Sequence, residues 1–216
     1  MASYKVIKIN GVAISTGNTK LGAIPSVSLA PWLSCHRNGP RDCTRACYAR
    51  KLARLRKNVS NSWESNANIW ANNPSCYFDA IRKFLYTTNV PRFRWHVAGD
   101  IPDIAYFNNM RDIAESFGDV HFLTFTKSYN IMALPDLAIP KNLTIRVSAW
   151  PGLQWTLNKG VMLKRGYPIA WVSQLKEAGA GYTDTIPSDA VACPGCCDNC
   201  DRCWANDAQH VVFKAH

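Results

Sequence analysis

The chain has 216 residues, of which 47% are apolar and 19% charged. This is enough apolar material for a packed core, and it excludes intrinsic disorder as the main state. The 25 Lys and Arg outnumber the 15 Asp and Glu, and the net charge of +10 favours polyanionic partners such as nucleic acid.

Targeting and membrane signals are not evident in the sequence. Residues 1–20 lack the charged and apolar segments of a signal peptide, and no apolar run reaches the length of a membrane span. We therefore expect a cytoplasmic protein that does not contact a membrane.

The first ninety residues predict a hairpin, a loop and three helices. Alternating apolar residues around the Asn10-Gly11 pair predict a hairpin over residues 5–14. Residues 17–40 are rich in Gly, Pro, Ser and Asn, which favours a loop. Helix-forming residues predict helices over residues 46–57, 61–71 and 76–86.

Beyond residue 91, short apolar segments recur at intervals of about 20 to 30 residues. The predicted strands span residues 94–98, 121–125, 143–148 and 169–172. Helical or loop segments separate them, such as residues 102–117 and 155–163. Strands that alternate with helices indicate βαβ units and a parallel sheet. We expect one α/β domain over residues 1–216, with an N-terminal part (1–57), a βα core (90–175) and a cysteine-rich tail (190–216).

Mainly polar residues follow these strands, at the edge where parallel α/β folds gather their chemistry. The residues at these ends are Gly99, Asp100, Thr126, Lys127, Trp150, Ser173 and Gln174. A functional site is therefore expected at the carboxyl ends of the strands.

The nine cysteines fall into two groups and one isolated position. The groups are Cys35, Cys43 and Cys47 near the front, and Cys193, Cys196, Cys197, Cys200 and Cys203 in the tail. An odd number cannot pair completely, and stable disulfides are rare in the cytoplasm. The grouped thiols are therefore predicted to be metal ligands, whereas the isolated Cys76 is predicted to pack as a small apolar residue.

The tail reads CPGCCDNCDRCW, a run of closely spaced thiols. Without Cys196, the positions Cys193, Cys197, Cys200 and Cys203 have the spacing C-x3-C-x2-C-x2-C. Serial short spacings favour a 4Fe–4S cluster, whereas zinc sites usually combine two separated C-x2-C pairs. We expect iron–sulfur here, with zinc as the alternative.

The front group has the spacing Cys35-x7-Cys43-x3-Cys47 and supplies three thiolates. A 4Fe–4S cube on three cysteines leaves one iron open to a substrate or a cofactor. His36 is an alternative fourth ligand, and incidental free thiols are the simpler interpretation. One or two clusters are therefore possible in the whole chain.

Several stretches of the chain resemble the bacteriophage gene product 88 family, whose layout is similar to that of radical S-adenosylmethionine enzymes. The stretches are TKLGAIPSVSLAPWLSC, CYARK, FRWHVAGDIPD, FLTFTKSYN, NLTIRVSAWPG, VVFKAH and the cysteine-rich tail. The resemblance therefore covers nearly the whole chain. It implies a phage protein in the infected host cell.

The resemblance also implies an architecture and a cofactor. The fold would be a partial (β/α) barrel with parallel strands, and a 4Fe–4S cluster on the front cysteines would lie at its mouth. Gly99 and Asp100 would bind the amino group of S-adenosylmethionine. Apart from the resemblance, their position at strand ends predicts that Asp100 and Lys127 orient a bound molecule. Alternatively, Asp100 caps the next helix ahead of Pro102. The front spacing departs from the usual radical motif C-x3-C-x2-C.

Two functions follow from these observations. One is an iron–sulfur protein, either a radical-type enzyme or a redox protein. The other is a cluster- or zinc-stabilised module without enzymatic activity, which binds nucleic acid or a host protein. Its cationic helix would carry Arg50, Lys51, Arg54, Arg56 and Lys57 as phosphate contacts. A solvated helix surface is the simpler interpretation of these cations. No P-loop, Ser-His-Asp arrangement or H-E-x-x-H sequence is found.

Overall fold

The computed structural model describes residues 4–35, 43, 47–150, 152–173, 186–197, 199–205, 207 and 209–214. Its strands are β1 (Val6–Ile9), β2 (Val12–Ser15), β3 (Ser26–Val27), β4 (Arg92–Trp95), β5 (His121–Thr126), β6 (Leu143–Ser148), β7 (Ile169–Ser173), β8 (Val191–Ala192) and β9 (Val211–Lys214). Its helices are α1 (Pro31–Ser34), α2 (Tyr48–Leu55), α3 (Lys57–Asn72), α4 (Pro74–Thr88), α5 (Ile104–Ser116), α6 (Tyr129–Met132) and α7 (Leu153–Lys164).

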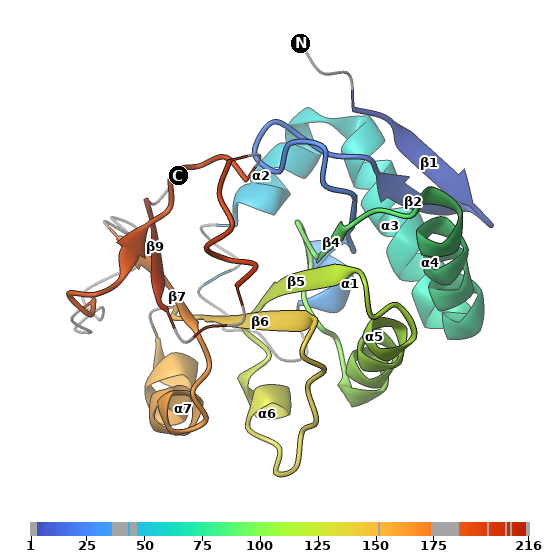
Figure 1. Ribbon diagram of the computed structural model, residues 1–216. Helices are drawn as coiled ribbons and strands as arrows, with labels where there is room; N and C mark the ends of the chain where they lie inside the picture. Colours follow the sequence, from blue (N-terminus) through green and yellow to red (C-terminus); the bar gives the residue numbers. More distant parts are fainter. Residues whose placement is uncertain are drawn as a thin grey trace.

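The strands form one largely parallel sheet in the order β1-β2-β3-β4-β5-β6-β7-β9-β8. Pairing is antiparallel between β1, β2 and β3 and parallel from β3 onward. The sheet is open, since β1 and β8 form its edges, and Figure 1 shows β1 and β9 on opposite sides of the molecule. The parallel α/β core is thus confirmed, whereas the partial barrel stays a prediction.

The N-terminal hairpin is confirmed. Strands β1 and β2 are joined by Asn10 and Gly11, which both have positive φ angles of 50° and 83°. This is the backbone that a tight two-residue hairpin requires, and Asn-Gly adopts it at low cost. Helices α3 and α4 lie beside this hairpin (Figure 1).

The two faces of the central strands have different neighbours. One face carries Phe93, Trp95 and Phe122, which pack with aromatic residues of the helices, such as Phe84 and Tyr106. The opposite face carries Arg94, Leu123, Phe125 and Arg146, and the cysteine-rich tail contacts it. The sheet is therefore covered by helices on one side and by the tail on the other.

Several predicted elements match the structure and two need correction. The expected strands 121–125, 143–148 and 169–172 are confirmed as β5, β6 and β7. The expected strand 94–98 exists as β4, but its predicted bounds are wrong, because β4 begins at Arg92 and ends at Trp95, where His96 adopts a positive φ of 55°. The expected helix 46–57 is also interrupted: Arg56 (φ −131°, ψ 89°) separates α2 from α3, and Leu55 is 82% exposed rather than packed.

Membrane insertion finds no support in the described residues, none of whose helices is both long and apolar enough to span a bilayer. The isolated Cys76 lies on α4 and is half-buried, with its sulfur 4.0 Å from the carbonyl oxygen of Asn10.

Candidate metal centre

The three front cysteines lie around the ends of two short helices. Cys35 directly follows α1, and Cys47 is the residue before α2. Cys43 lies between them in the chain and interacts electrostatically with both Cys35 and Cys47. The structure therefore places the three predicted ligands in one region of the molecule, but not close enough together to hold a metal as they stand. His36 lies outside the described residues.

The carboxyl ends of β4 and β5 adjoin this group of thiols. Asp100 is 6% exposed, and its carboxylate accepts hydrogen bonds from Thr126 Oγ1 (2.6 Å), Lys127 N (2.8 Å) and Ile101 N (2.8 Å). Through these hydrogen bonds, Asp100 links the loop after β4 to the carboxyl end of β5. The interpretation of Asp100 as a helix cap is wrong, because Asp103 caps α5 by accepting from Tyr106 N at 2.8 Å. Binding of an ammonium group by Asp100 stays a prediction.

Lys127 supplies the positive charge of this site. Burial lowers the pKa of its ammonium, but the neighbouring Cys43 and Asp100 raise it more, so the net shift is upward and the group is charged. Its Nζ also lies 5.2 Å from the centre of the Trp150 ring. Burial raises the pKa of Cys35 and Cys43, and Lys127 opposes the rise in both. Thiolates at these positions therefore need a partner that compensates for burial, as a metal does.

Gly99 allows the loop after β4 to approach α1 closely. Its φ is +86°, and a Cβ there would lie 2.7 Å from both Leu29 O and Ser34 Oγ. Ser34 Oγ accepts a hydrogen bond from Asp100 N at 3.3 Å, so this approach also fixes Asp100. Gly99 therefore has a packing role whether or not it contacts a cofactor.

We expect Gly99→Ala to destabilise the protein by about 2 kcal/mol, because a side chain at positive φ is strained and would also clash with backbone. Urea unfolding measures this loss. Gly166→Ala is the matched control, since Gly166 also has positive φ (72°) but has open space around its Cβ position. Equal losses in the two variants would contradict a role for close packing at Gly99.

The tail is held on the sheet by one buried arginine and one tryptophan. The fully buried Arg146 on β6 donates to the carbonyl oxygens of Cys203 (3.0 Å), Gln209 (2.6 Å) and Arg202. Trp204 is 4% exposed and packs with Leu21, Ile24 and Leu123. These contacts fix the polypeptide on both sides of the last tail cysteine.

The four predicted tail ligands gather at this face of the sheet. Cys197 interacts electrostatically with Cys193, Cys200 and Cys196, and Cys203 interacts with Cys193 and Cys197. Burial raises the pKa of the Cys203 thiol to about 11, although Arg146 and Arg94 lower it. Cys196 is exposed. In the described part of the chain, no group of three or more His, Cys, Asp or Glu side chains is placed closely enough to hold a metal as it stands.

Arg94 was not predicted as part of the site. It is 9% exposed on β4, and its guanidinium lies 4.2 Å from the centre of the Phe125 ring. Burial lowers its pKa to about 10, opposed by Tyr48, Cys203 and Cys197. No acceptor among the described residues reaches its Nε, and none of their carboxylates forms an ion pair with it. The only sequence signal is an arginine inside the apolar run FRW, a pattern that by itself suggests an exposed side chain.

The predicted cationic helix is real but divided. Lys51 and Arg54 lie on α2, Arg56 lies at the break, and Lys57 begins α3; all four are exposed. Arg50 on α2 is half-buried. Phosphate binding by these residues stays a prediction.

Comparison with known proteins identifies one family. No curated protein and no solved structure matches the chain. The family model described as gene product 88 matches residues 8–209, which include all nine cysteines, the strand-end residues and both buried arginines. A match over nearly the whole chain shows that this protein belongs to the gene product 88 family of bacteriophage proteins.

Proposed function

We propose that this protein binds iron–sulfur clusters. Cys35, Cys43 and Cys47 would hold one 4Fe–4S cluster at the carboxyl ends of β4 and β5. The tail ligands would be Cys193, Cys197, Cys200 and Cys203. Sulfur donors of this number and serial spacing are typical of such clusters.

The observation that carries the proposal is the buried charge of Arg94. A guanidinium removed from water costs several kcal/mol unless a negative group compensates for it. The titratable groups near Arg94 that could carry a negative charge are the tail thiols Cys197 and Cys203 and the phenol of Tyr48, and burial keeps all three protonated in the absence of a metal. Neutral thiols would leave this cation without a counter-charge, whereas metal-bound thiolates provide one.

Arg146 supports the same interpretation. Its guanidinium interacts with Cys203 and also forms an ion pair with the half-exposed carboxylate of Asp207, 3.7 Å away. A buried cation beside the tail thiols is what a site in which four thiolates surround a metal centre would require. Such a site requires rotation of the thiol side chains, which the small and polar residues between the cysteines allow. Zinc in the tail is the alternative, because it has the same charge balance.

The residues at the front have distinct tasks in this proposal. Three cysteines leave one iron of a bound cluster without a protein thiolate, and such a cluster supplies one-electron chemistry. Lys127 balances the negative charge of the thiolates. Asp100 holds the ends of β4 and β5 together and is the candidate acceptor for the ammonium of S-adenosylmethionine. A radical-type activity and the partial-barrel layout belong to this part of the proposal, in which the front cluster binds S-adenosylmethionine.

We expect protein purified without oxygen to be brown, with broad absorption near about 400 nm from charge transfer between thiolate and iron. Iron and sulfide assays should then give matching amounts per chain. A colourless protein with one firmly held zinc would contradict the iron–sulfur proposal for the tail.

The same sample distinguishes a reactive cluster from an electron carrier. Addition of S-adenosylmethionine should change the electron paramagnetic resonance spectrum of the reduced protein, and Asp100→Asn should weaken this change more than it lowers the iron content. An unchanged spectrum at saturating S-adenosylmethionine would remove the radical-type arm and leave a redox or structural cluster.

A further inference from the structure

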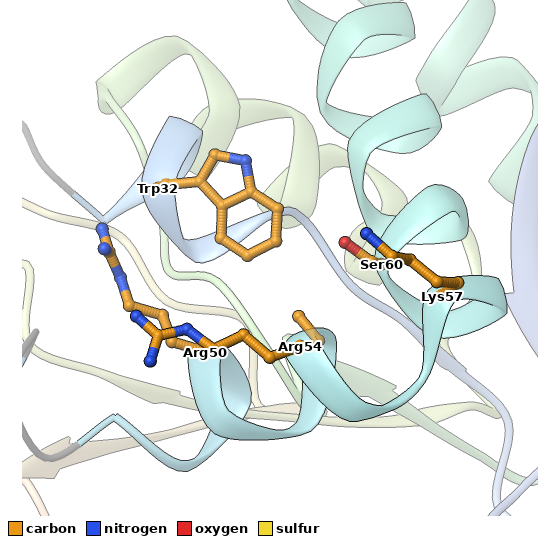
Figure 2. Close-up of a pocket in the computed structure, with 6 residues that line it drawn as sticks. Trp32, Arg50, Arg54, Lys57 and Ser60 are labelled. Atoms are coloured by element: carbon orange, nitrogen blue, oxygen red, sulfur yellow. The ribbon is translucent and has the colours of Figure 1, made fainter.

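A small pocket lies between α1 and the junction of α2 with α3. Its volume is about 190 Å³. The residues that line it are Trp32, Arg50, Ala53, Arg54, Lys57 and Ser60. Figure 2 shows the indole of Trp32 facing α2 across the pocket, with the guanidinium groups of Arg50 and Arg54 to one side and Lys57 and Ser60 to the other.

The break at Arg56 gives the pocket its positive charge. Because α2 ends at Leu55 and α3 begins at Lys57, cations from two helices border one cavity. No carboxylate in the described ranges forms an ion pair with Arg54 or Lys57. Among the described residues, no carboxylate therefore neutralises the positive charge of these two side chains.

The first turn of α3 adds to this potential. Lys57 and Ser60 both line the pocket, and the helix begins without a side-chain cap from Arg56. The amino end of a 16-residue helix carries partial positive charge. Ser60 Oγ donates a hydrogen bond to the carboxylate of Glu64 at 3.3 Å. An anion is thus the ligand that this side of the pocket favours.

The size and the wall of the pocket restrict the ligand further. At about 190 Å³, the pocket is smaller than the roughly 300–1,000 Å³ typical of sites for whole cofactors. It suits one planar ring, and the half-buried indole of Trp32 provides a flat surface for stacking. A ring flanked by anionic groups is the chemistry that this combination recognises.

We propose that this pocket binds one nucleotide unit of a single-stranded nucleic acid. The base stacks on Trp32, and the phosphates on either side of it contact Arg50 and Arg54 at one end and Lys57 at the other. Cations on both sides of the ring suit a unit within a strand, which carries a phosphate before and after the base. Lys51 and Arg56 do not line the pocket and are not part of this site.

The pocket proposal does not depend on the identity of the metal. Helix α1 leads into Cys35 and α2 follows Cys47, so the pocket adjoins the front group of thiols. Its lining residues are nevertheless all outside the proposed ligand sets. Iron and sulfide content, measured on each variant, therefore separates failure of the cluster proposal from failure of the pocket proposal.

The test is binding of a fluorescein-labelled thymidine oligonucleotide of about twelve nucleotides, followed by fluorescence anisotropy at several salt concentrations. Trp32→Leu should weaken binding about tenfold or more, whereas Trp32→Phe should keep most of it, because only Phe retains a stacking surface. Unchanged binding in Trp32→Leu would overturn the stacking site, as would equal losses in the two variants. Circular dichroism of both variants verifies that they fold.

Charge variants test the phosphate contacts. Arg54→Gln and Lys57→Gln should each reduce the slope of log affinity against log salt by about 0.7. Lys83→Gln on α4 is the matched control, since Lys83 is exposed and lies outside the pocket, and it should leave the slope unchanged. An equal reduction in Lys83→Gln would show general attraction to a basic protein and overturn the site. Thymidine monophosphate should compete only weakly, and equally strong competition would overturn the strand and indicate a free nucleotide.

Discussion

Arg146→Met should lower the free energy of unfolding by about 3–5 kcal/mol, a large fraction of the stability of a domain of this size. The guanidinium is fully buried and donates to the carbonyl oxygens of Cys203, Gln209 and Arg202. Methionine fills a similar volume but leaves these acceptors without a donor. The tail would then lose its main polar attachment to β6, so metal retention by the tail should fall as well.

Urea unfolding, monitored by the fluorescence of tryptophan, measures the loss of stability. The matched control is Arg165→Met, because Arg165 also donates to two backbone carbonyls, those of Met132 (3.3 Å) and Leu134 (2.5 Å), but is exposed. Exposed hydrogen bonds are replaced by water, so this variant should lose less than about 1 kcal/mol. Similar losses in both variants would show that burial of Arg146 does not determine its contribution.

The strands that the sequence predicts best are those in the centre of the sheet. Residues 143–148 match β6 at both ends, because LTIRVS is rich in β-branched residues and is followed by a loop. The bounds of β4 could not be predicted. Its end depends on the left-handed backbone of His96, whose ring lies 3.0 Å from the hydroxyl of Tyr106 in a buried contact. Such a contact is formed by tertiary packing and leaves no local signal.

Very short strands and strands that pair over a long sequence distance could not be predicted either. Strand β3 has two residues, and β9 pairs with β7 across the whole tail. Neither gives the periodic pattern from which strands are recognised. The break between α2 and α3 could not be predicted either, because the run ARLRKN contains no glycine or proline that would end a helix at Arg56. The exposure of Leu55 follows from that break.

For the tail site, the sequence predicted the sulfur ligands but not the two buried arginines beside them. The grouping of cysteines in the sequence indicated both sets, because thiol ligands usually lie close together in the chain. Arg94 and Arg146 come from different strands and meet the tail only in the folded chain. A charged residue in a strand is usually assigned to the solvent face, so an arginine within FRW or TIRVS suggests exposure. In the folded chain, the cysteine-rich tail covers the face of the sheet that carries both arginines, so they are buried.

Cys200→Ser should abolish metal binding by the tail, and Cys196→Ser should leave it intact. The serial spacing of Cys193, Cys197, Cys200 and Cys203 already supplies four thiolates, and adjacent cysteines rarely reach one metal centre in good geometry. Both cysteines belong to the same tail, but Cys196 is exposed whereas Cys200 is half-buried. Cys197 also has its backbone N–H bound to Lys20 O at 2.8 Å, which directs this position toward the sheet.

Metal and sulfide assays on anaerobically purified variants measure this difference. Iron bound by the front cysteines would add to the measured metal content. Each substitution is therefore made in a parent in which Cys35, Cys43 and Cys47 are replaced by Ser. In that parent, Cys200→Ser should lose nearly all remaining metal, together with the 400 nm absorption. Cys196→Ser should retain both. If Cys196→Ser loses as much metal as Cys200→Ser, the ligand set is wrong and the counter-charge of Arg94 must come from a different group of thiolates, one that includes Cys196.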